Sequence, residues 1–132
     1  MPNSSNIRDM PKKILLVEDE AALRKTLGEV LKQEGYKMIL AADGETGLML
    51  AKTKKPDLIL LDLVLPKLHG FDVLTQLKSD PSTKQIPVIV LTNLEKIEDI
   101  EKAIEMGATT YLIKARYSLE EVVEKVRKIF EE

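Results

Sequence analysis

The sequence has no cysteine and no tryptophan, and aromatic residues make up only 4% of its 132 residues. The absence of cysteine excludes disulfide bonds, thiolate catalysis and zinc sites with cysteine ligands. Long apolar runs are missing too, since none approaches the roughly 20 residues that cross a bilayer. We therefore expect a cytoplasmic protein with an aliphatic core and no membrane contact.

Neither sign of charge dominates, because 20 basic residues stand against 22 acidic ones. No general attraction to nucleic acid is expected, so we predict no direct nucleic-acid partner. A hydrophobic content of 44% is enough for the core of one domain. Residues 1–11 are polar and have no apolar segment typical of a signal peptide, so we expect a flexible N-terminal tail there.

From Lys12 onward, short apolar runs alternate with amphipathic stretches. Five such pairs predict an α/β fold in which helices cover both faces of a parallel sheet. The expected strands are residues 12–17, 36–42, 57–62, 87–92 and 109–114. The expected helices are residues 21–34, 44–55 and 70–80, a fourth from about 94 that ends at Gly107, and a last one from Ser118.

Typical start and stop residues support these boundaries. Asp43 has the position of an N-cap, and Pro56 ends the helix that follows it. Gly35 is a suitable C-terminal stop for the first helix. "SLEE" at residues 118–121 fits a capping box, in which the serine and the last glutamate cap one helix reciprocally.

Polar residues stand where several of these apolar strands end. Glu18 and Asp19 follow the first strand, Asp62 ends the third, Thr92 the fourth and Lys114 the fifth. In open parallel sheets, ligands bind outside the carboxyl ends of the strands. We therefore expect these five side chains to gather at one edge of the sheet.

The composition of this group predicts its chemistry. Neighbouring carboxylates repel one another unless a cation lies between them, and Mg2+ prefers oxygen ligands, often carboxylates together with phosphate. Lysine and threonine are suited to hold an anion. One chemistry that joins these groups is an aspartyl phosphate, in which the carboxylate is the nucleophile while metal and lysine offset charge.

Four segments, in this order and spacing, carry a resemblance to a known family: "LLVEDE", "LLDLVLPKLHG", "VIVLT" and "YLIKA". They resemble the receiver domain of bacterial two-component response regulators, over roughly residues 12–131. The resemblance implies a flavodoxin-like, doubly wound five-stranded parallel sheet of order 2-1-3-4-5 with five helices, and a receiver domain over residues 12–132. Both a single-domain, chemotaxis-regulator-like protein and a piece of a longer chain remain open.

The resemblance also implies a role for each matching residue. Asp62 would be the phosphoacceptor and Asp19 a direct Mg2+ ligand, while Glu18 would hold the metal through water. Four further residues have implied roles. The backbone carbonyl of Val64 would bind the metal, Thr92 and Lys114 would contact phosphoryl oxygens, and Tyr111 would be the aromatic switch residue.

The implied function is signalling by phosphoryl transfer. The donor would be a sensor histidine kinase or a histidine phosphotransfer protein, and the readout surface would be the fourth helix, fifth strand and fifth helix. A downstream protein or output domain would bind that surface, and a phosphorylation-dependent dimer is possible. The domain would not be an enzyme, because it promotes only its own phosphorylation and dephosphorylation.

Some positions depart from the family pattern. Ala115 stands where most receivers have proline, often after a cis bond, so the bond is either cis here or the loop is altered. Asn93 replaces a small residue and either narrows access to the phosphoryl group or adds a hydrogen bond. Val64 and Leu94 are apolar where polar side chains can orient water, which predicts a long-lived phosphorylated form.

Three alternatives belong to other classes. A flavodoxin-like cofactor binder is disfavoured because "EDEAAL" follows the first strand in place of a glycine-rich phosphate loop. An aspartyl-phosphate hydrolase would need a second acid where Val64 stands, and a cap domain. The remaining rival is a pseudo-receiver that binds partners without phosphorylation.

The only histidine, His69, is interpreted as a surface loop residue.

Overall fold

A computed structural model describes residues 10–131 of the protein. A sheet of five parallel strands in the order β2-β1-β3-β4-β5 forms its centre, which confirms the predicted fold class and strand order. Most of the tail predicted for residues 1–11 lies outside the described residues. The strands are β1 (Lys13–Val17), β2 (Lys37–Ala41), β3 (Leu58–Leu61), β4 (Val88–Thr92) and β5 (Thr110–Ile113).

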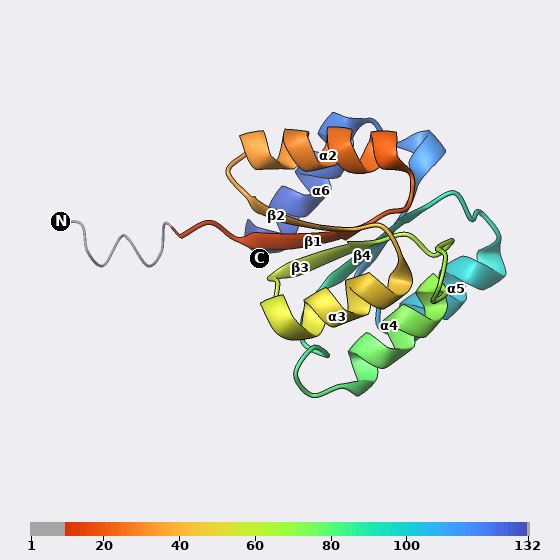
Figure 1. Cartoon of the computed structure of the whole chain (residues 1–132). Helices are drawn as coiled ribbons and strands as arrows, with labels where there is room; N and C mark the ends of the chain where they lie inside the picture. Colours follow the sequence, from red (N-terminus) through yellow and green to blue (C-terminus); the bar gives the residue numbers. More distant parts are fainter. Residues whose placement is uncertain (1–9, 132) are drawn as a thin grey trace.

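Helices cover both faces of the sheet (Figure 1). On one face lie α2 (Ala21–Gln33) and α6 (Leu119–Glu131). On the other lie α3 (Gly44–Lys54), α4 (Gly70–Ser79) and α5 (Ile97–Glu105). A short 3-10 turn, η1 (Lys114–Arg116), connects β5 to α6.

The interior strands β3 and β4 are buried along their whole length, as their continuous aliphatic runs predict. Successive strand side chains point to opposite faces, so the core has two halves. Leu61 and Val90 pack in the half beneath α3, α4 and α5, whereas Leu60 and Ile89 pack in the half beneath α2 and α6.

The predicted helix caps are present. Asp43 is the N-cap of α3, where its side chain accepts a hydrogen bond from the backbone N–H of Thr46 at 2.7 Å. Ser118 and Glu121 form the predicted capping box, with each side chain accepting from the other's backbone N–H at 3.1 and 2.9 Å. These contacts fix where α3 and α6 begin.

The fourth predicted helix begins later than expected, at Ile97 and not near Leu94. The side chain of Leu94 is partly buried and packs against the core, while its carbonyl accepts a hydrogen bond from Tyr111. The apolar periodicity before Ile97 therefore reflects the packing of a loop. The fifth strand also stops one residue early, and Lys114 begins the turn η1.

The loop between β3 and α4 is held by close backbone approaches. A Cβ atom on Gly70 would lie 2.3 Å from the Cα of Leu63, and one on Gly44 would lie 1.9 Å from the carbonyl oxygen of Leu68. Only glycine fits at either position without a shift of the backbone. The loop after β3 is thereby fixed against the N-termini of α3 and α4.

No helix among the described residues has the length and the apolar character needed to cross a membrane.

Candidate functional site

Strand pairing brings the predicted acidic residues together. Val17 and Leu61 are partners in the parallel ladder between β1 and β3, so the residues after them, Glu18 and Asp62, emerge side by side. The N–H of Asp62 donates to the carbonyl of Val17 at 3.1 Å, which extends the ladder to the acidic residue. The side chains of Glu18 and Asp62 are 1% and 5% exposed, so both carboxylates are buried at the strand ends.

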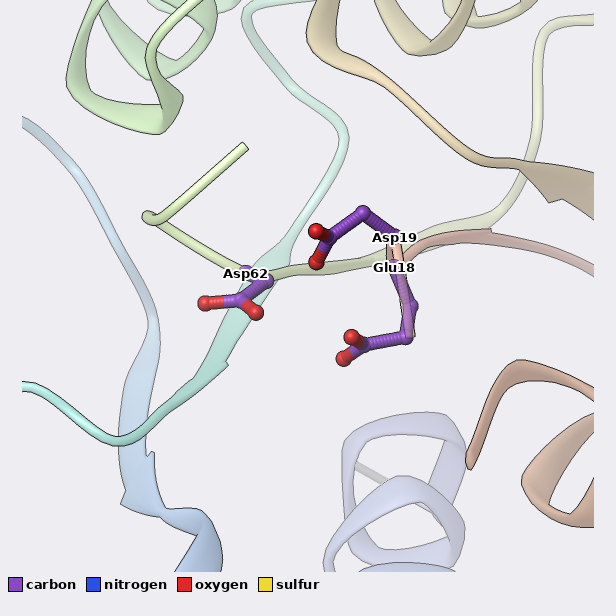
Figure 2. A group of neighbouring side chains, drawn as sticks. All are labelled: Glu18, Asp19 and Asp62. Carbon is purple, nitrogen blue, oxygen red and sulfur yellow. The ribbon is translucent and has the colours of Figure 1, made fainter. Parts of the chain in front are cut away.

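Three carboxylates gather around one space at this edge (Figure 2). Oxygen atoms of Glu18, Asp19 and Asp62 all lie within 4.8 Å of one another. Asp19 is exposed and comes from the same turn as Glu18, whereas Asp62 comes from the end of β3 (Figure 2). Three oxygen donors at this separation form a candidate site for a hard divalent cation.

Lys114 is the positive group that meets this cluster. Its Nζ lies 2.8 Å from Oε1 of Glu18 and 2.8 Å from Oδ2 of Asp62. Burial raises the pKa of Glu18, and the hydrogen bond from Lys114 offsets only part of this effect. Burial lowers the pKa of Lys114, but its hydrogen bonds to Asp62 and Glu18 outweigh burial and the pKa is raised. The lysine therefore stays charged between the two carboxylates.

The main chain around Asp62 also contributes to the site. The N–H of Val64 donates to Oδ1 of Asp62 at 3.1 Å, so both oxygens of this carboxylate have a partner. The side chain of Val64 is 53% exposed and makes the rim apolar. A cavity of about 230 Å³ lies over the cluster, and its lining is Glu18, Asp19, Glu20, Asp62, Val64, Asn93 and Lys114.

Thr92 ends the neighbouring strand β4 and is fully buried. Its Oγ1 is the one buried side-chain polar atom in residues 10–131 that has no hydrogen-bond partner there. A buried hydroxyl without a partner costs free energy, so such groups are usually satisfied by another group or a ligand. This hydroxyl can donate to an anionic oxygen bound at the strand ends.

Tyr111 lies on β5, where its hydroxyl donates to the carbonyl of Leu94 at 2.9 Å. Burial raises the pKa of Tyr111 to about 12, and the negative charges of Asp99 and Asp62 add to this effect. The hydrogen bond ties the fifth strand to the segment that leads from Thr92 into α5. Tyr111, the predicted switch residue, therefore contacts the segment between Thr92 and α5, whose conformation a switch would have to change.

The structure of the turn after Lys114 decides whether the bond before Ala115 is cis or the loop is altered. The described residues contain no cis peptide bond, and residues 114–116 form the 3-10 turn η1. The N–H of Tyr117 donates to the carbonyl of Lys114 to close this turn. Lys114 thus reaches both carboxylates through an altered loop with a trans bond.

Two further contacts were missing from the sequence-based prediction. Arg24 on α2 donates from Nη1 to the backbone carbonyl of Glu18 at 2.8 Å and holds the acidic turn against the helix. His69 is exposed, but it is also the N-cap of α4, where Nδ1 accepts from the N–H of Phe71 at 3.2 Å. Position before a predicted helix was a signal for His69, whereas nothing in the sequence marked Arg24.

Together, the fold and the site define a class of protein. A doubly wound parallel sheet carries, at the carboxyl ends of its strands, a carboxylate cluster with one half-buried lysine and one buried threonine. This is a class of α/β domain that binds ligands at a topological switch point.

The comparison with known families identifies the particular family. Residues 14–127 match the response regulator receiver domain, and the chain belongs to this family of two-component systems. The alkaline phosphatase synthesis transcriptional regulatory protein PhoP of Bacillus subtilis is 41% identical over 120 residues, which are 91% of this chain and 49% of PhoP. The chain spans about half the length of the curated relatives it matches.

Solved structures of receiver domains and response regulators are similar to this chain. A receiver domain protein from Methanospirillum hungatei has a TM-score of 0.85 and 25% identity, covering 92% of this chain and 94% of that one. The phosphorylated cyanobacterial phytochrome response regulator RcpA has a TM-score of 0.77 and 35% identity, covering 92% of both chains. The receiver domain of a Pseudomonas aeruginosa sensor histidine kinase, with magnesium in its active site cleft, has a TM-score of 0.80 and 28% identity, covering 89% of this chain and 96% of that one.

Proposed function

We propose that Asp62 accepts a phosphoryl group from a phosphohistidine of a sensor kinase or a histidine phosphotransfer protein. The observation that carries the proposal is the position of Lys114, whose Nζ lies 2.8 Å from Asp62 in a group of three carboxylates. A receiver-family relative, RcpA, has been solved in a phosphorylated form, which supports the same chemistry here.

In the transfer, an oxygen of Asp62 forms a bond to phosphorus as the phosphorus–nitrogen bond of the donor breaks. The electron pair of that bond remains on the imidazole of the donor. Lys114 offsets negative charge on the transferring group, and the Oγ1 of Thr92 donates to one of its oxygens. The protein's contribution is therefore position and charge, since Thr92 is held at the end of the buried strand β4 and Lys114 is held between two carboxylates.

The donor set fits Mg2+. The carboxylates of Asp19 and Asp62 and the backbone carbonyl of Val64 would hold the ion directly, while Glu18 would hold it through water. When bound, Mg2+ supplies positive charge that offsets the charge of the phosphoryl oxygens. The magnesium in the cleft of the Pseudomonas aeruginosa receiver domain supports this assignment.

We infer that phosphorylation is read at the surface formed by α5, β5 and α6. A new partner draws Thr92 toward the phosphoryl group and alters the segment that leads from this residue to α5. The hydroxyl of Tyr111 donates a hydrogen bond to the carbonyl of Leu94 in this segment. On phosphorylation this hydrogen bond would break, and the ring would move closer to Thr92. A downstream protein, an output domain or a second phosphorylated copy would bind the changed surface.

The transcriptional regulators among the relatives are about twice as long as the matched segment. We propose that this receiver portion itself contacts proteins and not nucleic acid, because its net charge is −2.

Mass spectrometry after incubation with Mg2+ and acetyl phosphate tests the proposal. We expect the wild type to gain about 80 Da and the Asp62→Asn variant to gain nothing. A second control is Asp57→Asn, because Asp57 is a carboxylate at the opposite edge of the sheet, where Oδ2 accepts from the N–H of Lys13. This variant should be phosphorylated like the wild type.

If the wild type gains no mass although Mg2+ binds, the protein is a pseudo-receiver and Asp62 is not an acceptor. If Asp62→Asn gains mass as well, the acceptor is another residue. Turnover of acetyl phosphate far beyond one phosphate per chain without a stable product would favour the hydrolase alternative.

A further inference from the structure

A second hollow in the molecule lies away from the carboxylate cluster, between α2 and the edge strand β2. It has a volume of about 550 Å³. This groove has a wall formed by α2 and a floor formed by β2, and its lining includes Arg24, Lys25, Gly28, Lys32, Met38 and Leu40.

The wall of the groove is basic. Arg24, Gly28 and Lys32 are spaced four residues apart and therefore lie on one face of α2, with Lys25 beside them. Within residues 10–131, Lys25 and Lys32 take part in no ion pair, and both are exposed. Glu29 is the only carboxylate that lines the groove, in a chain whose net charge is −2.

The floor of the groove is apolar. Leu40 is 44% exposed, and Met38 lies two residues earlier on the same face of β2 and is half-buried. A Cβ atom on Gly28 would lie 3.3 Å from Cδ2 of Leu40, so even a methyl group would crowd this leucine. Glycine at this helix position keeps the leucine uncovered.

The groove also lies at an open edge of the sheet. β2 has β1 as its only partner among the described strands, so its outer edge presents backbone groups that another segment could pair with. A peptide can bind by pairing as an additional strand with an exposed edge strand. In this mode, backbone hydrogen bonds give affinity and side-chain pockets give specificity. This mode combines with the basic wall and the apolar floor.

We propose that this groove binds a partner protein through an acidic segment with aliphatic side chains. Carboxylates of the segment would face Lys25 and Lys32, and its aliphatic side chains would cover Leu40 and Met38. The apolar floor favours a protein over a nucleic acid, whose backbone offers phosphates without aliphatic groups. The groove needs neither Mg2+ nor a phosphoryl group, so it is a second interaction surface beyond the proposed phosphorylation.

An NMR titration of the full chain tests the proposal with a defined probe. The probe is a short synthetic peptide of alternating glutamate and leucine, added to 15N-labelled protein in low salt without Mg2+. We expect saturable shifts confined to residues 24–32 and 37–41. Charge reversal by Lys25→Glu together with Lys32→Glu should weaken binding at least about tenfold. Arg24 is left unchanged because it also holds Glu18.

Two controls separate this groove from general charge attraction. Lys84→Glu together with Lys128→Glu changes the net charge equally at exposed positions that do not line the groove, and should leave binding unchanged. Leu40→Ser keeps the basic wall and should weaken binding because it removes the apolar floor. Amide shifts elsewhere in each variant report that the fold is intact.

Several results would overturn the proposal. They are the absence of saturable shifts, shifts centred on other elements, and equal binding of a matched peptide with lysine in place of glutamate. Equal or tighter binding of a single-stranded oligonucleotide or an anionic vesicle at the same residues would show a different class of occupant. Shifts of these residues with protein concentration alone would show that the occupant is a second copy of the chain.

Discussion

Replacing Asp62 by asparagine should make the metal-free protein more stable, although it removes an ion pair. Asp62 is buried beside Glu18 and near Asp19, and a single lysine serves the cluster. If the site holds a cation and a phosphoryl group as proposed, its like charges lie close together when neither is bound. We expect the free energy of unfolding to rise by about 1–2 kcal/mol in the presence of EDTA.

The magnitude follows from the distances. At an effective dielectric constant of about 20, the 2.8 Å contact between Lys114 and Asp62 contributes about 6 kcal/mol of attraction. A hydrogen bond from Lys114 to the asparagine oxygen would retain about 2 kcal/mol of it. The charge on Asp62 also has costs: repulsion from Glu18 within 4.8 Å is at least about 3.5 kcal/mol. Burial of the ion costs several kcal/mol more, so removal of the charge is favourable.

Urea unfolding at pH 7.5, followed by far-UV circular dichroism, measures the effect. For a domain of this size, the expected change raises the urea midpoint by about 0.5–1 M. The Asp57→Asn variant is the matched control, because Asp57 accepts a backbone hydrogen bond without the carboxylate cluster around it. This control should be neutral or slightly destabilised.

Addition of Mg2+ should reverse the order. A ligand that binds only the folded state adds about 2.7 kcal/mol of stability at a concentration of 100 Kd, and Asp62→Asn lacks one of the proposed ligands. The wild type should therefore gain more from Mg2+ than the variant does. A metal-free variant less stable than the wild type by 1 kcal/mol or more would refute the reasoning, because attraction to Lys114 would then outweigh repulsion and burial.

Three other changes test separate parts of the structure. Ser118→Ala should lower the free energy of unfolding by about 1 kcal/mol in urea titrations, because it breaks the capping box of α6; an unchanged midpoint would contradict this. Neutral Tyr111 favours the folded state, so its contribution is complete below pH 10 and is lost as pH rises through its folded pKa of about 12. Spectrophotometric titration should show a tyrosine that ionises late, and Tyr111→Phe should remove it. Val64→Asn should shorten the half-life of the phosphorylated protein at least about tenfold, because a polar side chain can orient the attacking water; a wild-type half-life of seconds would count against the reasoning.

The sequence was most informative where apolar runs end in polar residues. Burial on both faces requires continuous aliphatic strands, and parallel pairing brings all carboxyl ends to one edge. For this reason the sequence alone predicts that Glu18, Asp62 and Lys114 lie together. The capping box at Ser118 was equally predictable, because it depends only on neighbours in the chain.

Contacts between distant segments could not be predicted in the same way. The apolar spacing from Leu94 resembled a helix, but this residue packs from a loop and accepts a hydrogen bond from Tyr111. Arg24 could have pointed into solvent, and its contact with the Glu18 carbonyl depends on the path of the turn between them. The groove at β2 depends on Gly28 lying over Leu40, which needs the register of helix and strand.

The carboxyl and amino ends of the strands carry different residues, and this difference has a practical use. The carboxyl edge carries the acidic cluster, while the loop at Lys84 is exposed and lies near the opposite end, where β4 begins. Because the sequence has no cysteine, Lys84→Cys would create a single thiol for a fluorophore, and a second thiol at exposed Ile97 would mark α5. If α5 moves on phosphorylation as proposed, the distance between a pair of dyes at these positions would change, and single-molecule fluorescence can follow that change in time.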